Sequence, residues 1–407
     1  MADNDIDVLL VGIGGYGQNY LNELLDSDRD DYRIVGVVDP YADSSSRIEE
    51  IRERGIPVFP SMLEFYKEHN ADYVCISSPI QFHSEQTMMA LNKGAGVICE
   101  KPLSATVQEG YKMLATQKQL ARPVGIGYQW SFSNAIQSLK KDIMKGVLGK
   151  AVRLKTLVFW PRDFRYYNRS NWAGKKQDGN GKWILDSVAN NATAHYLHNM
   201  FYVLGQSIEE SAWPKILQSE LYRANDIENY DTAAVKVWTE EGVELLYLVT
   251  HATQEQVNPR FCYEFENATV YFDQDGENQI VAEFKDGSQK VYGDPFADPI
   301  NKVWVMLDAI KGKSSYLCGI EAALPHVTCI NGMQESLPDI TEFPEKLVKF
   351  KIDEQGNEQG VYVEGLSDIL LDCYNKWELP HELGVEWAKA GREINLTGYK
   401  HFPSTDL

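Results

Sequence analysis

The sequence has few cysteines, and their spacing is irregular. Its six cysteines are scattered along the chain, at Cys75, Cys99, Cys262, Cys318, Cys329 and Cys373. No two of them have the short spacing that holds zinc or marks a redox motif. Cys75 and Cys99 lie inside apolar runs, where a free cysteine usually acts as a small core side chain. We therefore expect all six to be reduced and structural.

The sequence also lacks long hydrophobic runs and an excess of positive charge. No stretch approaches the ~20 apolar residues that cross a bilayer, and the first residues have neither the basic start nor the cleavage site of a signal peptide. Acidic residues number 59 against 39 basic ones, for a formal charge of -20. Such a surface repels phosphate backbones and anionic membranes. We expect a cytoplasmic protein without nucleic-acid or membrane partners.

The first third of the chain alternates short apolar runs with amphipathic segments of helical length. This alternation predicts βαβ units around a parallel sheet. Ser61 and Glu64 form a capping box at the start of a predicted helix, residues 62–69. The predicted strands are residues 6–11, 32–38, 73–77, 96–99 and 123–127.

A glycine-rich turn follows the first predicted strand. Residues 12–17 read Gly-Ile-Gly-Gly-Tyr-Gly, a G-x-G-x-x-G between strand and helix that is typical of dinucleotide binding. Asp39 ends the second strand, where a carboxylate suits the ribose hydroxyls of NAD and repels the extra phosphate of NADP. NAD is favoured, although Ser44, Ser45 and Arg47 lie close enough in sequence to tolerate a 2′-phosphate.

A lone lysine stands at the end of the strand 96–99, in the triplet Glu100-Lys101-Pro102. Most lysines are solvated, so a surface turn is the simplest interpretation of this position. In an open parallel sheet, however, the carboxyl ends of the strands face the ligand crevice, which would place Lys101 beside a cofactor. The predicted cofactor-binding residues are Gly12, Ile13, Gly14, Gly15, Tyr16, Gly17, Asp39, Ser78, Pro79, His83, Glu100 and Lys101.

With this triplet the chain resembles the glucose–fructose oxidoreductase, inositol dehydrogenase and MocA family over most of residues 6 to about 335. The resemblance implies a Rossmann domain followed by an open, mainly antiparallel sheet domain, whose face usually builds a homodimer or homotetramer. It also implies that Lys101 and a histidine segment surround the substrate carbinol beside the nicotinamide. Four motifs carry it: the glycine loop, Ser78-Pro79 with His83, Glu100-Lys101-Pro102, and His195-Tyr196-Leu197-His198 with Leu204-Gly205.

The histidine segment departs from the family pattern Asp-x-Gly-x-His. Asn191 stands where the family usually has the aspartate, so His195 is the predicted base and Lys101 the predicted cation, with Asn191 as a hydrogen-bonding partner. If the pKa of Lys101 is depressed, Lys101 is the alternative base. Asp186 is a further candidate to replace the missing carboxylate. His195 and His198 have the spacing of a metal pair but no recognisable third ligand, so no metal is predicted.

The segment 160–175 is aromatic and cationic, and it predicts a carbohydrate site. Aromatic faces pack on sugar rings, while arginine and asparagine reach hydroxyl or carboxylate groups. A loop that simply covers the sheet is the alternative interpretation. His251 is a weaker candidate for the same pocket. The predicted substrate-binding residues are Tyr128, Trp160, Arg162, Tyr166, Trp172, Asn191 and His195.

The predicted organisation is an α/β plus α+β chain in three parts. Residues 1–130 form the NAD-binding domain, residues 131–337 the substrate and oligomerisation domain, and residues 338–407 an extension packed on it. Strands are expected within residues 151–160, 232–250 and 260–284, where β-branched and aromatic residues are frequent. The extension is expected to hold a strand at 346–351, a turn at 354–357, and helices at 366–377 and 383–390.

Together these features predict an NAD-dependent oxidoreductase that acts on a secondary hydroxyl of a sugar, polyol or glycoside. A redox-neutral glycoside hydrolase or lyase that oxidises its substrate transiently is one alternative. A non-catalytic sensor of NAD or sugar is another, and the presence of Lys101 and His195 argues against it.

Overall fold

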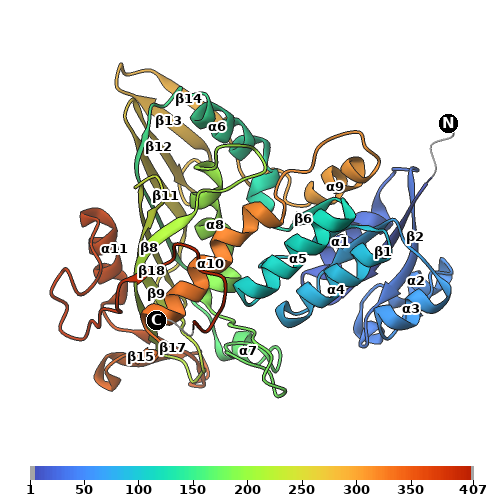
Figure 1. The fold of residues 1–407 in the computed structure, drawn as a ribbon. Helices are drawn as coiled ribbons and strands as arrows, with labels where there is room; N and C mark the ends of the chain where they lie inside the picture. Colours follow the sequence, from blue (N-terminus) through green and yellow to red (C-terminus); the bar gives the residue numbers. More distant parts are fainter. Residues whose placement is uncertain (1–4, 405–407) are drawn as a thin grey trace. The chain divides into compact units, whose positions relative to one another are not determined.

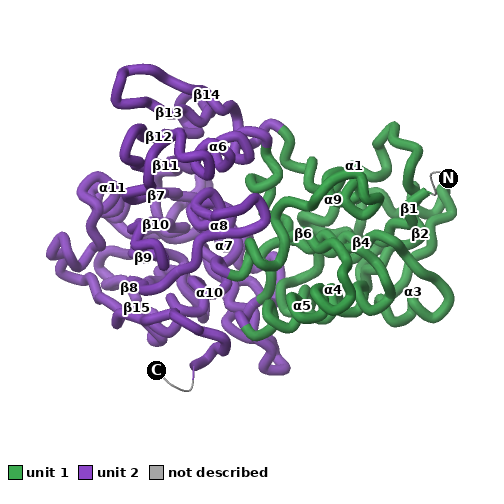
Figure 2. The backbone as a smooth tube through the Cα atoms, turned by 45° about the horizontal axis from the view of Figure 1, so that its top comes forward, with its two compact units in different colours: residues 1–104, 108–133, 298–324 green, residues 105–107, 134–297, 325–407 purple. Residues whose placement is uncertain are grey.

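The computed structural model describes residues 5–404, so the outermost residues of the predicted first domain and of the extension lie outside it. The chain divides into two compact units. Figure 2 colours the first unit green, residues 5–104, 108–133 and 298–324, and the second purple. Within the described residues, no helix combines the length and apolar character needed to span a bilayer.

The first unit is built on a six-stranded parallel sheet (Figure 1). Its strand order, β3-β2-β1-β4-β5-β6, is that of a dinucleotide-binding fold. The sheet and every strand predicted for this region are confirmed. The strands are β1 (Ile6–Val11), β2 (Tyr32–Val38), β3 (Val58–Phe59), β4 (Tyr73–Ile76), β5 (Gly96–Cys99) and β6 (Val124–Ile126).

The helices of this unit follow the strands as the βαβ pattern predicts. The predicted capping box is present at α3, where Ser61 Oγ accepts a hydrogen bond of 3.3 Å from the Glu64 N–H. The helices between the strands are α1 (Gly17–Asp26), α2 (Ile48–Glu53), α3 (Met62–Glu68), α4 (Ile80–Asn92) and α5 (Val107–Leu120).

A segment from far along the sequence completes the first unit. The sequence analysis places residues 298–324 in the second domain, but α9 (Lys302–Ile310) packs on β4, β5 and β6. Gly96 and Gly125 make this packing close, because a Cβ at either would lie within 2.7 Å of a side chain of α9. The segment was assigned to the second domain because it follows that domain in the sequence. Sequence order does not show that the chain returns to the first unit at residues 298–324.

The second unit is built on a ten-stranded, mainly antiparallel sheet. The strands expected within residues 151–160, 232–250 and 260–284 are confirmed, while β8 and β14 were not predicted. The main path of the sheet is β14-β13-β12-β11-β7-β10-β9-β8-β15. Its strands are β7 (Ala151–Phe159), β8 (Pro214–Arg223), β9 (Thr232–Thr239), β10 (Glu244–Thr250), β11 (Val257–Phe265), β12 (Ala268–Asp273), β13 (Ile280–Phe284), β14 (Gln289–Gly293), β15 (Thr341–Glu342) and, beside β8, β18 (Ile394–Asn395).

Helices cover one face of this sheet. Figure 1 shows α8 (Ala194–Val203) and α10 (Ile320–Ser336) on the side of the sheet away from α11 (Leu366–Lys376). Tyr247 of β10 points to α8 and donates hydrogen bonds to the Thr193 carbonyl, at 2.8 Å, and hydroxyl, at 2.6 Å. This contact fixes the start of α8, next to His195. The sixth helix, α6 (Asn134–Met144), packs beside β14.

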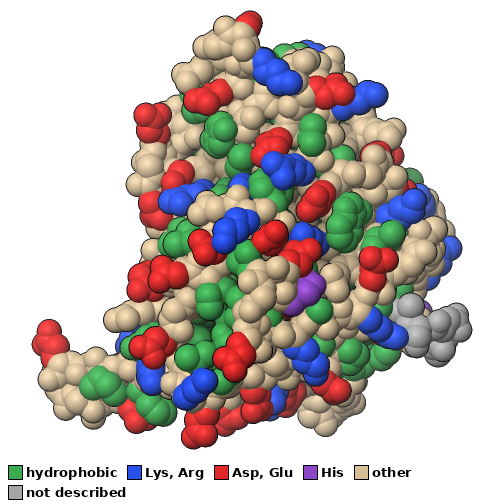
Figure 3. Space-filling model, turned by 90° about the vertical axis from the view of Figure 1, so that its left-hand side faces the viewer, with side chains coloured by type: hydrophobic (Ala, Val, Ile, Leu, Met, Phe, Trp, Pro, Cys, Tyr) green, Lys and Arg blue, Asp and Glu red, His purple; other side chains and the backbone are tan. Residues whose placement is uncertain are grey.

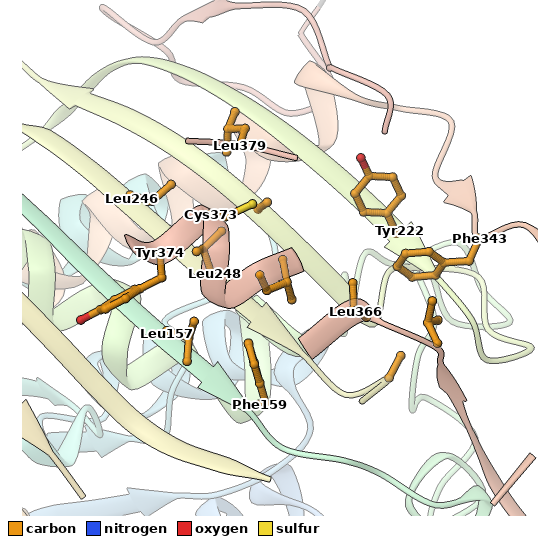
Figure 4. Packing of buried hydrophobic residues seen from close by; sticks show 14 of the residues in the cluster. Leu157, Phe159, Tyr222, Leu246, Leu248, Phe343, Leu366, Cys373, Tyr374 and Leu379 are labelled. Carbon is orange, nitrogen blue, oxygen red and sulfur yellow. The ribbon is translucent and has the colours of Figure 1, made fainter. Parts of the chain in front are cut away.

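The C-terminal extension covers the opposite face of the sheet. It contains the hairpin β16 (Val348–Ile352) and β17 (Glu358–Val363), followed by α11. Figure 4 shows Leu157 and Phe159 of β7, and Leu246 and Leu248 of β10, gathered with Leu366, Cys373 and Tyr374 of α11. Apolar side chains that would otherwise meet water are therefore buried by the chain itself.

Charged side chains on the covered face are paired with the extension. Lys155 donates a hydrogen bond of 2.7 Å to the Tyr374 carbonyl, and Lys236 lies 2.6 Å from Glu382. Glu220, with 0% exposed area, accepts a 2.6 Å contact from His381. Buried charges need such partners, so the face is matched to this extension.

The covered face bears on the predicted oligomer. A homodimer or homotetramer through the sheet remains a prediction, and β12, β13 and β14 contribute no residue to the apolar cluster under α11. In the view of Figure 3, from the side that carries α11, acidic and basic side chains are interspersed.

The helix expected at 383–390 is wrong: this segment forms turns, with Gly384 at φ +71°.

Candidate functional site

The glycine loop is shaped by close backbone approaches. Gly12 has φ +78°, and a Cβ there would lie 2.9 Å from the Ser77 backbone. A Cβ on Gly17 would lie 2.0 Å from the Gly12 carbonyl oxygen, so this glycine lets α1 pack on the loop. Gly14 differs, because a Cβ there meets nothing within 4 Å. The loop therefore leaves an open cradle at Gly14, which fits the approach of a dinucleotide pyrophosphate.

These glycines predict two different defects. Gly17→Ala should lower the free energy of unfolding of the ligand-free protein by about 1–3 kcal/mol, since the added methyl overlaps backbone. Gly14→Ala should leave that stability nearly unchanged and weaken NAD binding by more than about tenfold. Urea unfolding and calorimetric titration with NAD measure the two effects. Equal loss of stability in both variants would contradict the assignment of Gly14 to the cofactor cradle.

Asp39 lies at the end of β2, against the glycine loop. One carboxylate oxygen accepts a hydrogen bond of 2.9 Å from Ile13 N–H, and the other accepts one of 2.8 Å from Tyr41 N–H. Each carboxylate oxygen has a second lone pair for a ribose hydroxyl. Arg47, the predicted alternative contact for a 2′-phosphate, is paired with Asp26 at 2.7 Å and with Glu50 at 2.5 Å.

The sheet register places the glycine loop and the lysine triplet in one row. Val11 pairs with Ile76, and Ile76 pairs with Cys99, across β1, β4 and β5. Gly12, Ser77 and Glu100 consequently follow side by side at the carboxyl edge. With ~4.8 Å between neighbouring strands, the triplet begins roughly 10 Å from the glycine loop. This edge is where open α/β sheets bind ligands.

His83, on α4, joins two of these strand ends. Its ring nitrogens lie 2.7 Å from the Pro102 carbonyl and 2.8 Å from the Ser78 carbonyl. Burial lowers the pKa of His83, so the ring is neutral at pH 7 and donates to one of these carbonyls. The predicted residues Ser78, Pro79 and His83 thus lie beside the turn that carries Lys101. The His83 side chain is buried behind this turn.

Glu100 holds the turn that carries Lys101. Its carboxylate accepts hydrogen bonds of 2.6 Å from the Tyr20 hydroxyl and 3.1 Å from the Lys101 N–H. It also pairs with Lys302 of α9, a residue that the sequence analysis did not identify. Lys101 itself is half-buried.

Tyr128 does not lie on an accessible surface of the first unit. Its exposed fraction is 0%, and its hydroxyl is hydrogen-bonded to the Leu103 backbone. The position just after β6 suggested a pocket residue, but the ring packs into the core instead. The prediction that Tyr128 contacts substrate is not supported by this placement.

In the second unit, Asn191 and a carboxylate lie together. Asn191, in the turn η3 (Val188–Ala192), donates a hydrogen bond of 2.8 Å to Asp186 Oδ1. Asp186 has 2% exposed area, and its other oxygen accepts one of 2.7 Å from Gly174 N–H. His195 follows at the start of α8 and is half-buried. Asp186 therefore supplies a carboxylate beside the residue that replaces the expected aspartate.

The predicted aromatic and cationic residues form one connected cluster in this unit. β7 and β10 pair in parallel, with Phe159 opposite Thr250, so Trp160 and His251 leave the sheet at the same edge. Ring centroids are 5.5 Å apart for Tyr166 and His251, and 5.7 Å apart for Trp160 and Tyr196, the neighbour of His195.

Two guanidinium groups flank the Tyr166 ring in this cluster. Arg162 lies 4.7 Å and Arg169 lies 3.8 Å from its centroid, and Arg169 also stacks on Trp172 at 4.8 Å. Arg169 is 3.8 Å from Asp186, which links the cluster to Asn191. Arg169 was not predicted as a site residue, although its spacing from Tyr166 and Trp172 places it in the same aromatic segment.

His251 is a buried member of the cluster. Its ring contacts the Trp160 carbonyl at 2.7 Å. Burial lowers the pKa of His251 to about 3, and the charges of Arg162 and Arg169 act in the same direction. The ring is therefore neutral throughout the physiological range.

This shift predicts a pH-dependent contribution to stability. Between pH 6.5 and 3 the unfolded chain binds a proton at His251 that the folded chain does not, so folding stability falls as pH falls. Between pH 7 and pH 5 the protonation of His251 in the unfolded chain lowers the free energy of unfolding by about 2 kcal/mol, given an unfolded pKa of about 6.5. Urea unfolding at both pH values should show that His251→Gln loses less stability than the wild type by this amount. An equal loss in both proteins would contradict a neutral, buried ring.

Within residues 5–404, no group of three or more His, Cys, Asp or Glu side chains has an arrangement that could hold a metal ion.

The geometry of the first unit is that of a dinucleotide-binding Rossmann domain, and comparison with known families agrees. Residues 6–128 match the family described as "Oxidoreductase family, NAD-binding Rossmann fold", GFO_IDH_MocA. The resemblance indicated by the glycine loop and the lysine triplet is thereby confirmed. Over residues 6–128 the chain is similar to the glucose–fructose oxidoreductase, inositol dehydrogenase and MocA family.

The alignments with curated relatives each cover part of this chain and part of the relative. D-Glucoside 3-dehydrogenase of Escherichia coli (strain K12) is 25% identical over 223 residues, which are 53% of this chain and 60% of that protein. The rhizopine catabolism protein MocA of Rhizobium meliloti is 28% identical over 34% of this chain and 43% of its own length. The NADP-dependent scyllo-inositol 2-dehydrogenase IolW of Bacillus subtilis (strain 168) is 31% identical over 35% of this chain and 39% of its own length.

Solved structures match the fold over a longer range. The WlbA dehydrogenase of Chromobacterium violaceum, in complex with NADH and UDP-GlcNAcA, superposes with a TM-score of 0.70 at 20% identity. The match covers 95% of that chain but 83% of this one. UDP-N-acetylglucosamine 3-dehydrogenase GnnA of Acidithiobacillus ferrooxidans gives a TM-score of 0.63 at 16% identity, over 96% of that chain and 81% of this one. Part of this chain therefore has no counterpart in either.

Proposed function

We propose that this protein is an NAD-dependent oxidoreductase that acts on a secondary hydroxyl of a sugar, polyol or glycoside. One observation carries the proposal: the register of β1, β4 and β5 sets Lys101 two strands from an open glycine cradle, at the edge where such sheets bind ligands. The relatives named for dehydrogenation of glucosides and inositols support the same class of substrate.

The side chains divide the chemistry as follows. NAD held in the glycine cradle would supply the acceptor for the hydride of the carbinol carbon. The Lys101 ammonium stabilises the negative charge that develops on the carbinol oxygen. His195 accepts the hydroxyl proton, because a neutral imidazole is a base near neutral pH. Asn191, held by Asp186, orients the hydroxyl through its amide.

The aromatic and cationic cluster suits the remainder of the substrate. The rings of Trp160, Tyr166 and Trp172 provide apolar faces for a sugar ring. Arg162 is within 4.7 Å of Tyr166, and guanidinium N–H groups bind hydroxyl or carboxylate oxygens. We assign the sugar-binding role to this cluster.

Asp39 predicts the choice of cofactor. Asp39→Asn keeps the shape of the side chain and removes the charge, so the ratio of NAD affinity to NADP affinity should fall at least roughly tenfold. Calorimetric titration of both dinucleotides measures this ratio. An unchanged ratio would show that Asp39 serves only the backbone contacts with Ile13 and Tyr41.

A spectroscopic assay with a panel of glycosides, free sugars and polyols tests the function. The proposal predicts steady formation of free NADH with at least one member of the panel. Cleavage of a glycoside without net NADH would favour the redox-neutral alternative. NAD and sugar binding without any turnover would favour a sensor.

A further inference from the structure

Lys302 is a fully buried lysine on α9 with 0% exposed area. Lysine is almost never buried to this extent unless its charge is compensated, because removing an ammonium group from water costs several kcal/mol. Its Nζ is paired with Glu100 and donates a hydrogen bond of 3.1 Å to the Gly127 carbonyl. The reaction described above gives this charge no role.

Within the first unit, Lys302 contacts both the glycine loop and the residue that holds the turn of Lys101. On one side its partner Glu100 accepts the hydrogen bond from the Lys101 N–H, at 3.1 Å. On the other side its Nζ lies 4.5 Å from the centroid of Tyr16, a residue of the glycine loop. One buried ammonium group therefore contacts both the residue that holds the lysine turn and the loop that forms the dinucleotide cradle.

The Glu100 carboxylate has little freedom to move. It accepts hydrogen bonds from Tyr20 of α1 and from Lys302 of α9, and it lies against Gly127, the residue after β6, where a Cβ would be 2.6 Å from its oxygen. Burial alone would lower the pKa of Lys302, but the nearby Glu100 and Tyr16 raise it overall, so Lys302 keeps its positive charge at neutral pH. Loss of either charge would leave the other buried and unpaired.

We propose that Lys302 is a positioning residue, which sets the place and charge environment of Lys101 by fixing the Glu100 carboxylate and linking it to the glycine loop. This inference rests on the proposed function, in which Lys101 contacts the reacting oxygen. Lys302 itself acts through Glu100 and touches no substrate.

Three variants test the inference. Lys302→Met removes the charge and keeps the length of the side chain. We expect kcat to fall roughly 100-fold, the effect of a misplaced catalytic group, with a much smaller change in the KM for sugar. Glu100→Gln leaves the Lys302 ammonium group buried without its carboxylate partner and should also lower kcat. The double variant Glu100→Gln/Lys302→Met has no buried charge, retains an amide oxygen for the Lys101 N–H, and should recover most of the loss.

A further readout separates positioning from general damage. Acylation of the Lys101 amine, followed by peptide mass spectrometry, should slow several-fold in Lys302→Met, since an uncompensated carboxylate favours the ammonium form. It should return towards wild type in the double variant. This readout does not depend on turnover.

Lys311→Met provides the matched control. Lys311 has 4% side-chain exposure, ends the same helix and is paired with Asp31 at 3.0 Å. Its replacement should lower stability through loss of a buried pair and leave kcat and Lys101 acylation unchanged.

The outcomes separate the two proposals. If the wild type reduces NAD with a sugar but Lys302→Met keeps kcat and Lys101 acylation within about twofold, the positioning role is wrong and the function stands. If the wild type reduces NAD with no sugar, the function fails and the acylation rates still decide the role of Lys302. If Lys302→Met does not fold, failure of the double variant to exceed Glu100→Gln in kcat overturns the inference.

Discussion

Replacement of Lys101 by methionine is expected to lower kcat for sugar oxidation roughly 10³-fold, near the upper range for removal of one group that stabilises a developing oxyanion. Methionine keeps the length of the side chain and removes the ammonium. The Lys101 N–H still bonds to Glu100, so the turn and the nearby glycine cradle should persist. NAD affinity should therefore change little. Steady-state kinetics and calorimetric titration with NAD measure the two quantities.

Lys67→Met is the control for this change. Lys67 is exposed in the same unit and pairs with Glu64 on α3, so its loss should leave kcat unaltered. A Lys101→Met variant that kept wild-type kcat would exclude Lys101 from the chemistry. A variant that lost NAD binding and activity together would assign Lys101 to the cofactor rather than to the carbinol oxygen.

Replacement of His195 by glutamine is expected to lower kcat by about 10²–10⁴-fold, the range for loss of a general base. Glutamine can still donate and accept hydrogen bonds, but it cannot take up the hydroxyl proton near neutral pH. Because the rate should then depend on hydroxide, the residual activity should rise with pH. Measurement of kcat between pH 6 and 10 tests this behaviour.

His401→Gln serves as the comparison for His195, because His401 is exposed and bonds only locally, 3.0 Å from the Pro403 carbonyl. Wild-type kinetics are expected. If His195→Gln retained the wild-type rate and pH dependence, the proton would have to pass to Lys101 or to Asp186, and the base assignment would be wrong.

Local sequence patterns predicted the first unit well. The glycine loop, Gly12 to Gly17, and Asp39 are recognised by their local spacing, because a tight turn and a closely packed helix require glycine at fixed positions. The apolar run before Glu100 likewise predicted β5 and the place of Lys101. Such features depend on neighbours in sequence, and the structure reproduces them.

The contacts that complete the candidate site come from distant parts of the chain. Lys302 lies about two hundred residues from Glu100, and nothing around it marks a buried lysine. Asp186, five residues from Asn191, was a candidate to replace the missing carboxylate, but the hydrogen bond between the two residues depends on the turn η3, which the sequence did not predict. Long-range pairing of charges is decided by packing, which short motifs do not record.

The extension illustrates the same limit. A helix was predicted at residues 366–377 and is present as α11, but its contact with β7 and β10 was beyond the sequence pattern. Residues 383–390 were also predicted to form a helix. In the structure this segment forms turns, from which Leu383 and Trp387 pack on the same apolar cluster.

Transfer of deuterium tests the central claim most directly. The wild-type protein is incubated with NAD and a panel of glycosides, sugars and polyols that carry deuterium on their carbinol carbons, and the cofactor is analysed by mass spectrometry. The account predicts that NADH with one deuterium accumulates with at least one substrate, and that Lys101→Met and His195→Gln nearly abolish it. Unlabelled cofactor with every member of the panel, despite bound NAD, would contradict it.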